Sequence, residues 1–189
     1  MGTTYIIAGL GNPGNKYINT RHNVGFDAID LMACINNISI TKVKFKALIG
    51  EGSIDGQRVI LVKPQTFMNL SGESIREIIE WYKIPVSNII IMFDDIDLEL
   101  GKIRVRPKGS SGTHNGMRNI LYQIQSDEFP RVRIGIGRPP EGWNLADYVL
   151  SKFTPDERTT INDSVKNAVE AASTILKSGV DAAMNKFNK

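Results

Sequence analysis

Apolar positions along this chain recur with two different spacings, and these spacings predict strands that alternate with helices. Continuous or alternating apolar runs are typical of strands, and they occur at 4–11, 46–54, 57–64, 88–93, 101–108 and 131–138. Apolar residues three or four positions apart are typical of helices that pack on one side, and they occur within 24–35, 68–85, 114–125 and 155–179. A short amphipathic segment is expected after the last helix.

Two local signals strengthen this assignment. Asp55-Gly56 separates two strand-like segments, and this dipeptide is the strongest short signal for a hairpin of antiparallel strands. Near the end of the chain, Thr154 precedes a proline and stands three residues before Glu157, which is the pattern of a capping box at a helix start. Alternation of strands and helices, with a hairpin inserted, predicts an α/β fold with a twisted mixed sheet flanked by helices on both faces.

Composition supports one globular domain over 1–189. The chain is 41% hydrophobic and 23% charged, as ordinary globular proteins are. No apolar run approaches the ~20 residues that span a bilayer, and the first residues lack the pattern of a signal peptide. We therefore expect a cytoplasmic protein without a membrane partner. Cys34 is the only cysteine, so no internal disulfide forms, and its place on an apolar helix face predicts a buried thiol.

The segment GLGNPG at 9–14 matches the glycine pattern of dinucleotide-binding loops. That pattern requires a helix to open within the loop, whereas here Pro13 and about ten polar residues precede the next helical pattern. The glycines are better explained by a tight turn that places Asn12 beside a ligand. No nucleotide cofactor is expected.

The acidic segment DDIDLE at 94–99 raises the question of a metal site. It fails the calcium-loop pattern, because Leu100 and Arg106 stand where a glycine and a glutamate are required. A magnesium site made of carboxylates stays open as an alternative. The other interpretation is that Asp94, at the carboxyl end of a buried strand, holds a polar partner above the sheet.

Basic residues recur at every second position in two segments. Lys102, Arg104, Arg106 and Lys108 alternate with apolar residues, and Arg131 and Arg133 flank Val132. Such a row also fits a strand with one face in water. Two rows, together with Lys42, Lys44 and Lys46, favour a phosphate-binding surface. The net charge of +3 alone does not decide the matter.

The chain has two histidines, and each is followed by an asparagine: His22-Asn23 and His114-Asn115. Both histidines precede a predicted helix. A single histidine at such a position is more often a capping or packing residue than a catalyst. Two such units, with Asp94 at a strand end, favour one site in which backbone amides at a helix start hold an anion or a developing oxyanion.

Four long segments resemble the signature blocks of bacterial peptidyl-tRNA hydrolases. They read GLGNPGNKYINTRHNVG, KPQTFMNLSG, DDIDLELGKIRVRPKGSSGTHNGM and RVRIGIGRP, occur in the family's order and cover most of 5–140. The resemblance implies a monomeric α/β esterase that cleaves the bond between a peptide and the 3′ ribose of tRNA. One position departs from the family pattern, since Thr113 stands where the run before His-Asn-Gly commonly has a glycine.

The resemblance also implies roles for residues at matching positions. His22 corresponds to the catalytic base, Asp94 to the carboxylate that orients it, and three asparagines lie around the scissile ester: Asn12, Asn69 and Asn115. Substrate-binding positions are Tyr17, Phe67, Met68, Gly112, His114 and Gly116. Positions for the tRNA phosphate are Arg104, Arg106, Lys108 and Arg133. No metal and no cofactor are expected, and the partner is peptidyl-tRNA, through its acceptor stem, 5′-phosphate and 3′ CCA end.

The chemistry is consistent without the family. A histidine of ordinary pKa, about 6.5, can deprotonate water near neutral pH, and asparagine amides can polarise the ester carbonyl. Three other classes stay possible at this stage: a non-catalytic RNA-binding protein of the same fold, a magnesium-dependent nuclease using DDIDLE, and a nucleotide-dependent oxidoreductase using GLGNPG.

Overall fold

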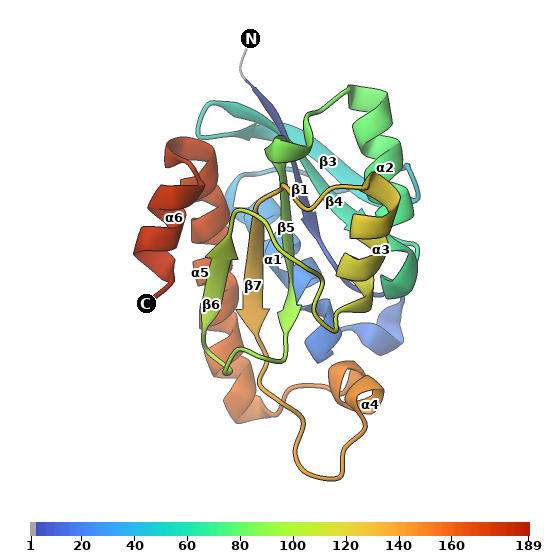
Figure 1. Ribbon diagram of the computed structural model, residues 1–189, viewed down its shortest axis with the longest axis vertical. Helices are drawn as coiled ribbons and strands as arrows, with labels where there is room; N and C mark the ends of the chain where they lie inside the picture. Colours follow the sequence, from blue (N-terminus) through green and yellow to red (C-terminus); the bar gives the residue numbers. More distant parts are fainter. Residues whose placement is uncertain (1–2) are drawn as a thin grey trace.

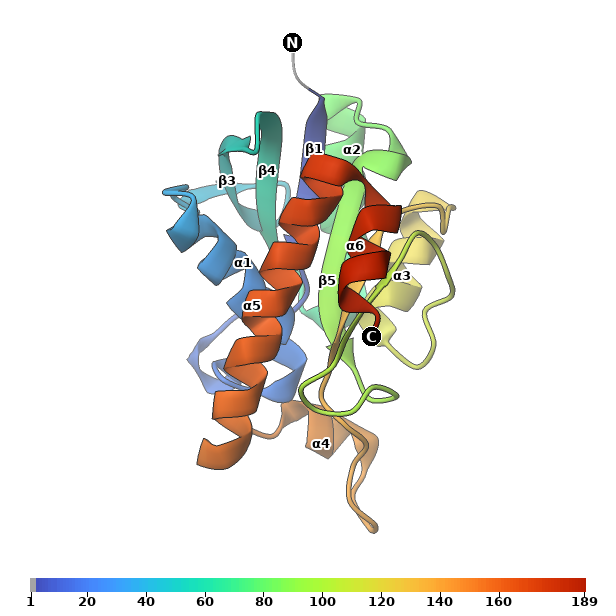
Figure 2. The same ribbon diagram turned by 90° about the vertical axis from the view of Figure 1, so that its left-hand side faces the viewer.

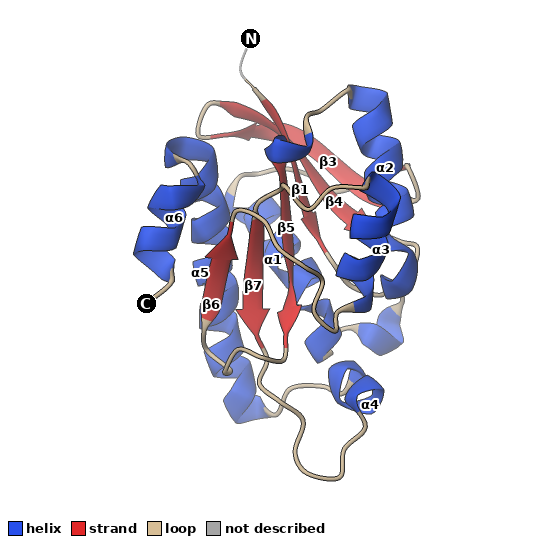
Figure 3. Cartoon of the chain, in the orientation of Figure 1, coloured by secondary structure: helices blue, strands red, loops and turns tan. Residues whose placement is uncertain are grey.

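Seven strands form one sheet in the computed structural model, which describes residues 3–189 (Figures 1 and 3). The strands are β1 Thr4–Gly9, β2 Lys42–Lys44, β3 Ala47–Ile54, β4 Gln57–Pro64, β5 Ile89–Asp95, β6 Ile103–Arg106 and β7 Arg131–Gly135. Their order is β2-β3-β4-β1-β5-β7-β6. The four central strands run parallel, whereas β2, β3 and β6 run antiparallel to their neighbours. The predicted mixed sheet is confirmed.

Helices cover both faces of this sheet. They are α1 Val24–Ile35, α2 Ser71–Tyr82, α3 Asn115–Ile124, α4 Leu145–Leu150, α5 Pro155–Ser178 and α6 Val180–Phe187. Single turns of 3₁₀ helix lie at Asn15–Tyr17, Arg21–Asn23, Met68–Leu70 and Val86–Asn88. Helices α1, α5 and α6 pack on one face, and α2 and α3 pack on the other (Figures 1 and 2). The predicted fold class is therefore confirmed, whereas the extent of a single domain over 1–189 stays a prediction whose first two residues lie outside the described part.

The core follows from strand alternation. In β1, Ile7 faces the cluster under α1 and α5, while Ile6 and Ala8 face the cluster under α2 and α3. All three are fully buried, because a central parallel strand has no face in water. No helix of the described part is long and apolar enough to cross a membrane.

Several local predictions are confirmed at the residue level. Helix α1 has the predicted bounds, and the β3–β4 hairpin turns at Asp55 and Gly56, which both have positive φ. The capping box at the start of α5 is formed on both sides by Thr154 and Glu157. Strand β2 and helix α4 were not predicted, because segments of three and six residues are too short to show a period.

The prediction for Cys34 is wrong. Its side chain is exposed, because in the last turn of α1 only Met32 and Ala33 are buried, whereas Cys34 and Ile35 face water. Ile35 is likewise 60% exposed. The apolar residues at this helix end do not all mark its core side.

The fold places a crevice at the carboxyl ends of β1 and β5. These parallel strands are neighbours. The next helices in the chain are α1 after β1 and, with β6 in between, α3 after β5, and they pack on opposite faces of the sheet. Ligands of open α/β sheets bind at such points. Helix α1 comes very close to β1 here, since a Cβ built on Gly25 would lie 2.4 Å from the backbone nitrogen of Leu10. The close approach lets the turn before α1 meet the end of β5.

Candidate active site

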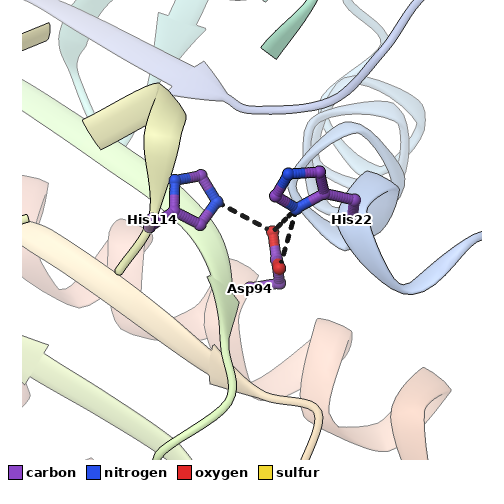
Figure 4. Close-up of side chains that lie close together, drawn as sticks. All are labelled: His22, Asp94 and His114. Atoms are coloured by element: carbon purple, nitrogen blue, oxygen red, sulfur yellow. Dashed lines mark hydrogen bonds and ion pairs between the residues drawn. The ribbon is translucent and has the colours of Figure 1, made fainter. Parts of the chain in front are cut away.

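Two buried histidines meet one buried carboxylate at this crevice (Figure 4). His22 comes from the 3₁₀ turn before α1, Asp94 from the end of β5, and His114 from the residue before α3. His22 Nδ1 lies 2.9 Å from each carboxylate oxygen of Asp94, and His114 Nε2 lies 3.0 Å from one of them. The two imidazole rings are 5.0 Å apart between centroids. The two histidine units that the sequence singled out thus share one carboxylate.

The hydrogen bonds determine which ring nitrogens carry protons. The backbone N–H of Met117 donates to His114 Nδ1, so the proton of a neutral His114 is on Nε2, which donates to Asp94. The ring of His114 also packs edge-on against Phe93. His22 donates to Asp94 through Nδ1, and its other ring nitrogen points away from Asp94 (Figure 4). That second nitrogen, Nε2, keeps its lone pair for accepting a proton.

Electrostatics favour a protonated His22 beside an ionised Asp94. Burial alone lowers the pKa of His22, but the charge of Asp94 and its hydrogen bond outweigh burial, so the pKa lies above 6.5. Burial likewise raises the pKa of Asp94, yet His22 and His114 together hold it well below its usual range. Asp94 is therefore a carboxylate at neutral pH, and it stabilises an imidazolium on His22.

A network of amides holds Asn12 beside this group. The side chain of Asn23 donates to the carbonyl oxygen of Asn12 at 3.0 Å and accepts from its backbone N–H at 2.8 Å. The side-chain oxygen of Asn12 accepts from the backbone N–H of Met68 at 2.7 Å. This leaves the amide NH₂ of Asn12 as a donor at the pocket. The sequence does not indicate that Asn23 anchors Asn12, although it shows Asn23 directly after His22.

These groups line a pocket of about 780 Å³. Among the predicted site residues, those lining it are Asn12, His22, Met68, Asn69, Asp94, Arg106, Lys108, Gly112, His114, Asn115 and Arg133. Asn115 accepts from Arg118 through its side-chain oxygen, so its NH₂ group remains a donor. One wall is formed by helix α4 through residues such as Leu145 and Val149, which the sequence did not indicate.

Four predicted residues lie outside the pocket lining: Tyr17, Phe67, Gly116 and Arg104. The rings of Tyr17 and Phe67 are in edge-to-face contact at 6.2 Å between centroids, and Phe67 directly precedes the lining residue Met68. Gly116 is needed for packing, since a Cβ there would lie 2.6 Å from the sulfur of Met68. Arg104 lies on β6 opposite Arg133 of β7.

One side of the pocket consists of basic residues from β6, β7 and the loop after β6, which we call the cationic wall. Arg106, Lys108 and Arg133 line it, and Arg133 donates through Nε to Asp95. Burial lowers the pKa of Arg106, and repulsion from Arg104 and Arg133 lowers it further. Like charges on neighbouring strands destabilise the free protein, so an anion bound here would be stabilised.

The expected surface role of Arg131 is wrong. Only 2% of this residue is exposed, because the loop that follows β6 covers it. Its guanidinium donates to the carbonyl oxygens of Gly109 and Ser110 in that loop, at 2.6 and 3.3 Å, and to that of Asp127 at 2.8 Å. Burial lowers the pKa of Arg131 to about 10. Arg131 is therefore a buried part of the pocket lining that holds Gly109 and Ser110 of the neighbouring loop in place.

The lysines at 42–46 do not join the cationic wall. They lie on or next to β2, at the opposite edge of the sheet from β6. Lys42 pairs with Glu51, and Lys46 pairs with Glu73 and Glu77. Lys44 lies over the rings of Phe45 and Trp81 instead of at the pocket, and this part of the expected phosphate surface is wrong.

The sequence leaves a magnesium site at DDIDLE open, but the structure brings a different set of possible metal ligands together. Within residues 3–189, the group whose side chains could jointly hold a metal ion is His22, Asp94 and His114, and their potential ligand atoms lie within 4.8 Å of one another. Within DDIDLE, Asp95 accepts from Arg133 and from the backbone N–H of Asp97, and Asp97 pairs with Arg138. In this structure the contacts within the group are hydrogen bonds, which His22 Nδ1 and His114 Nε2 donate to Asp94.

The α/β fold holds a histidine–carboxylate pair at a pocket, with amide donors on one side and cations on the other. This arrangement defines the class of a general-base hydrolase for an anionic substrate. The family model described as "Peptidyl-tRNA hydrolase" matches residues 6–189. The chain belongs to the peptidyl-tRNA hydrolase family.

Named relatives agree with this membership. The peptidyl-tRNA hydrolase of Alkaliphilus oremlandii is 54% identical over 184 residues, with 97% of this chain and 99% of the relative covered. That of Clostridium acetobutylicum is also 54% identical, with 97% of each chain covered. The crystal structure of peptidyl-tRNA hydrolase from Acinetobacter baumannii superposes with a TM-score of 0.91 at 35% identity, covering 98% of this chain and 95% of that one.

Proposed function

We propose that this protein hydrolyses the ester bond between the carboxyl end of a peptide and the 3′ ribose of tRNA. The observation that carries the proposal is the buried His22–Asp94 pair in a pocket with a cationic wall, in a chain of the peptidyl-tRNA hydrolase family. The product tRNA returns to translation. Because its substrate is made on ribosomes, the reaction belongs in the cytoplasm.

His22 acts as the general base. Its Nε2 takes a proton from a water molecule while the water oxygen attacks the ester carbonyl carbon, and Asp94 stabilises the imidazolium that forms. The tetrahedral intermediate then collapses, the bond to the 3′ oxygen breaks, and the imidazolium returns its proton to that oxygen. A peptide with a free carboxyl group and a tRNA with a free 3′ hydroxyl result, and the carboxyl group releases its proton to the solvent, so the step requires no metal and no cofactor.

Amide groups around the base position water and substrate. Asn12 and Asn115 each have a side-chain NH₂ that the surrounding hydrogen bonds leave available, and both line the pocket with Asn69. Donors of this kind stabilise the negative charge that develops on the carbonyl oxygen. Substrate contacts are assigned to residues of the pocket and its rim: Tyr17, Phe67, Met68, Gly112, His114 and Gly116.

The cationic wall is assigned to the tRNA. Arg106 and Arg133 receive the 5′-phosphate, with Arg104 and Lys108 nearby on the same strand and loop. The acceptor stem then lies over β6 and β7, and the 3′ CCA end enters the pocket beside His22. A monomer suffices, because the base, the amides and the cations all come from one chain.

The cationic wall alone also fits a non-catalytic RNA-binding protein, and the histidine–aspartate group alone also fits a metal site. One experiment separates these functions. Release of peptide from an N-acetyl-aminoacyl-tRNA is measured with wild type and His22→Ala, each with and without EDTA, and tRNA binding is measured in parallel. We expect EDTA-resistant cleavage by wild type, a loss of at least roughly 10² in His22→Ala, and similar tRNA affinity.

Each other outcome contradicts part of the proposal. Binding without cleavage by wild type would indicate an RNA-binding module. Cleavage that EDTA abolishes would indicate a metal held by His22, Asp94 and His114. Similar activity in His22→Ala would refute the role of this histidine as the base.

A further inference from the structure

A second cluster of buried side chains lies next to His22, around the preceding residue of the chain, and the reaction described above does not use it. Its centre is Arg21, of which 6% is exposed. Arg21 donates through Nη2 to both carboxylate oxygens of Glu157, at 3.1 and 2.8 Å, and through Nε to Ser151 at 3.1 Å. Its guanidinium carbon lies 4.5 Å from the ring centre of Tyr148 and 4.8 Å from that of Phe153. Four residues of the segment 148–157 thus surround a cation that lies more than 120 positions earlier in the chain.

The cluster requires the shape of an arginine. The planar guanidinium of Arg21 bonds Ser151 through Nε and Glu157 through Nη2 while its flat face lies over two aromatic rings, and an ammonium group cannot reproduce this set of contacts. The fit is incomplete, because the buried Nη1 of Arg21 has no hydrogen-bond partner within residues 3–189. An unpaired buried donor is costly, so stability alone does not account for this arrangement.

The cluster joins the turn that bears His22 to the wall of the pocket. The backbone N–H of Arg21 donates to the carbonyl oxygen of Ser151, and Thr20 forms an isolated β-bridge with Lys152. Ser151 follows α4, whose Val149 and Leu150 line the pocket, while Tyr148 of the same helix packs on Arg21. Glu157 lies in the first turn of α5. The orientation of His22 and the position of α4 are therefore set by the same contacts.

We propose that Arg21 is a positioning residue, which holds the His22 turn against α4 and α5 so that the imidazole keeps its bond to Asp94 and faces the pocket. The inference rests on the proposed function, since it assigns His22 as the base. Small displacements of a base are expensive for catalysis, because a misplacement of about 1 Å can cost roughly 10² in rate. The hydrogen bonds from Arg21 to Glu157 and Ser151 are the contacts that prevent such a displacement.

The test compares wild type with Arg21→Lys, which keeps the positive charge but loses the planar group that bonds Ser151 and Glu157 from two separate nitrogens. Both histidines of the chain lie in this site, so every imidazole signal in an NMR titration reports on it. We expect Arg21→Lys to lower kcat by about tenfold or more, with KM changed by less than about twofold. The measured pKa of His22 should fall from its wild-type value, because a looser contact with Asp94 leaves burial less opposed.

Arg58→Lys is the matched control. Arg58 of β4 donates to Glu51 at 2.9 Å and lies over the ring of Tyr82, so its replacement weakens an arginine–carboxylate pair of similar chemistry that is not in contact with the turn that bears His22. It should leave kcat and the His22 titration near wild type. Equal losses in both variants would overturn the proposal. So would a loss of kcat in Arg21→Lys without any change in the His22 titration, or no change in either.

If Arg21→Lys does not fold, Glu157→Gln decides the question. Glutamine keeps the size and the capping interaction with Thr154 but weakens the pair with Arg21, so it should shift kcat and the His22 pKa in the same directions by smaller factors. Values equal to wild type would overturn the proposal. The titration needs no activity, so an inactive wild type would refute the proposed function separately from the positioning role.

Discussion

Replacement of Asp94 by asparagine should inactivate the protein while leaving its shape intact. Asp94 accepts hydrogen bonds from His22 and His114, and a carboxylate has two oxygens for this purpose. Asparagine has one accepting oxygen and an NH₂ group. Because Met117 fixes the proton of His114 on Nε2, His114 takes the remaining oxygen. The NH₂ group then faces His22, whose Nδ1 must become an acceptor.

This exchange places the proton of His22 on Nε2, the nitrogen that should take a proton from water. We therefore expect kcat/KM to fall by roughly 10² to 10⁴, the range of a positioned general base, with tRNA affinity unchanged. The pKa of His22 should fall below 6.5, since burial lowers it and the opposing charge of Asp94 is gone. Both changes have one cause and should appear together.

The assay is peptide release from an N-acetyl-aminoacyl-tRNA, combined with an NMR titration of the two histidines. Asp27→Asn is the control, because it is the same substitution at an ion-paired aspartate. Asp27 pairs with Arg158 and lies outside the pocket lining. Activity of Asp94→Asn within about threefold of wild type, or an unchanged His22 titration, would refute the hydrogen-bond assignment, since the lost base is expected to cost roughly 10² or more.

Three further predictions concern the neighbouring groups. His114→Ala should lose much less activity than His22→Ala but should lower the melting temperature, because the N-cap of α3 is worth about 1 kcal/mol; equal losses of turnover would contradict this. Arg133→Ala should weaken tRNA binding and reduce the slope of log affinity against log salt by about 1, and an unchanged slope would argue against a phosphate contact. The kcat/KM of wild type should rise with pH through a pKa above 6.5, since the base is active only when deprotonated and its pKa is raised; a midpoint below 6.5 would show that Asp94 does not control it.

Much of the fold follows from patterns that are local in the chain. Helix α1, the β3–β4 hairpin and the cap of α5 each depend on residues within a few positions of one another, so periodicity and turn chemistry determine them. The site residues were found in another way, since His22, Asp94 and the asparagines stand in long segments shared with a family. Thr113, the one departure, lies in an exposed loop of the pocket, and the structure does not assign it a contact that affects the base.

Only the tertiary structure decided which polar groups meet and which face water. Alternation along β7 showed that Arg131 and Arg133 share a face, but the loop after β6 covers Arg131, whereas the side chain of Arg133 stays partly exposed. The same pattern could not show that the lysines of β2 lie at the far edge of the sheet, because strand order comes from pairing between distant segments. Contacts between distant positions also place His114 and His22 on the same carboxylate of Asp94 and join Arg21, in the turn that bears His22, to Glu157 of α5. These contacts span 20 to 136 positions of the chain. Sequence determined the elements and the chemical groups, and long-range packing determined the site that they form.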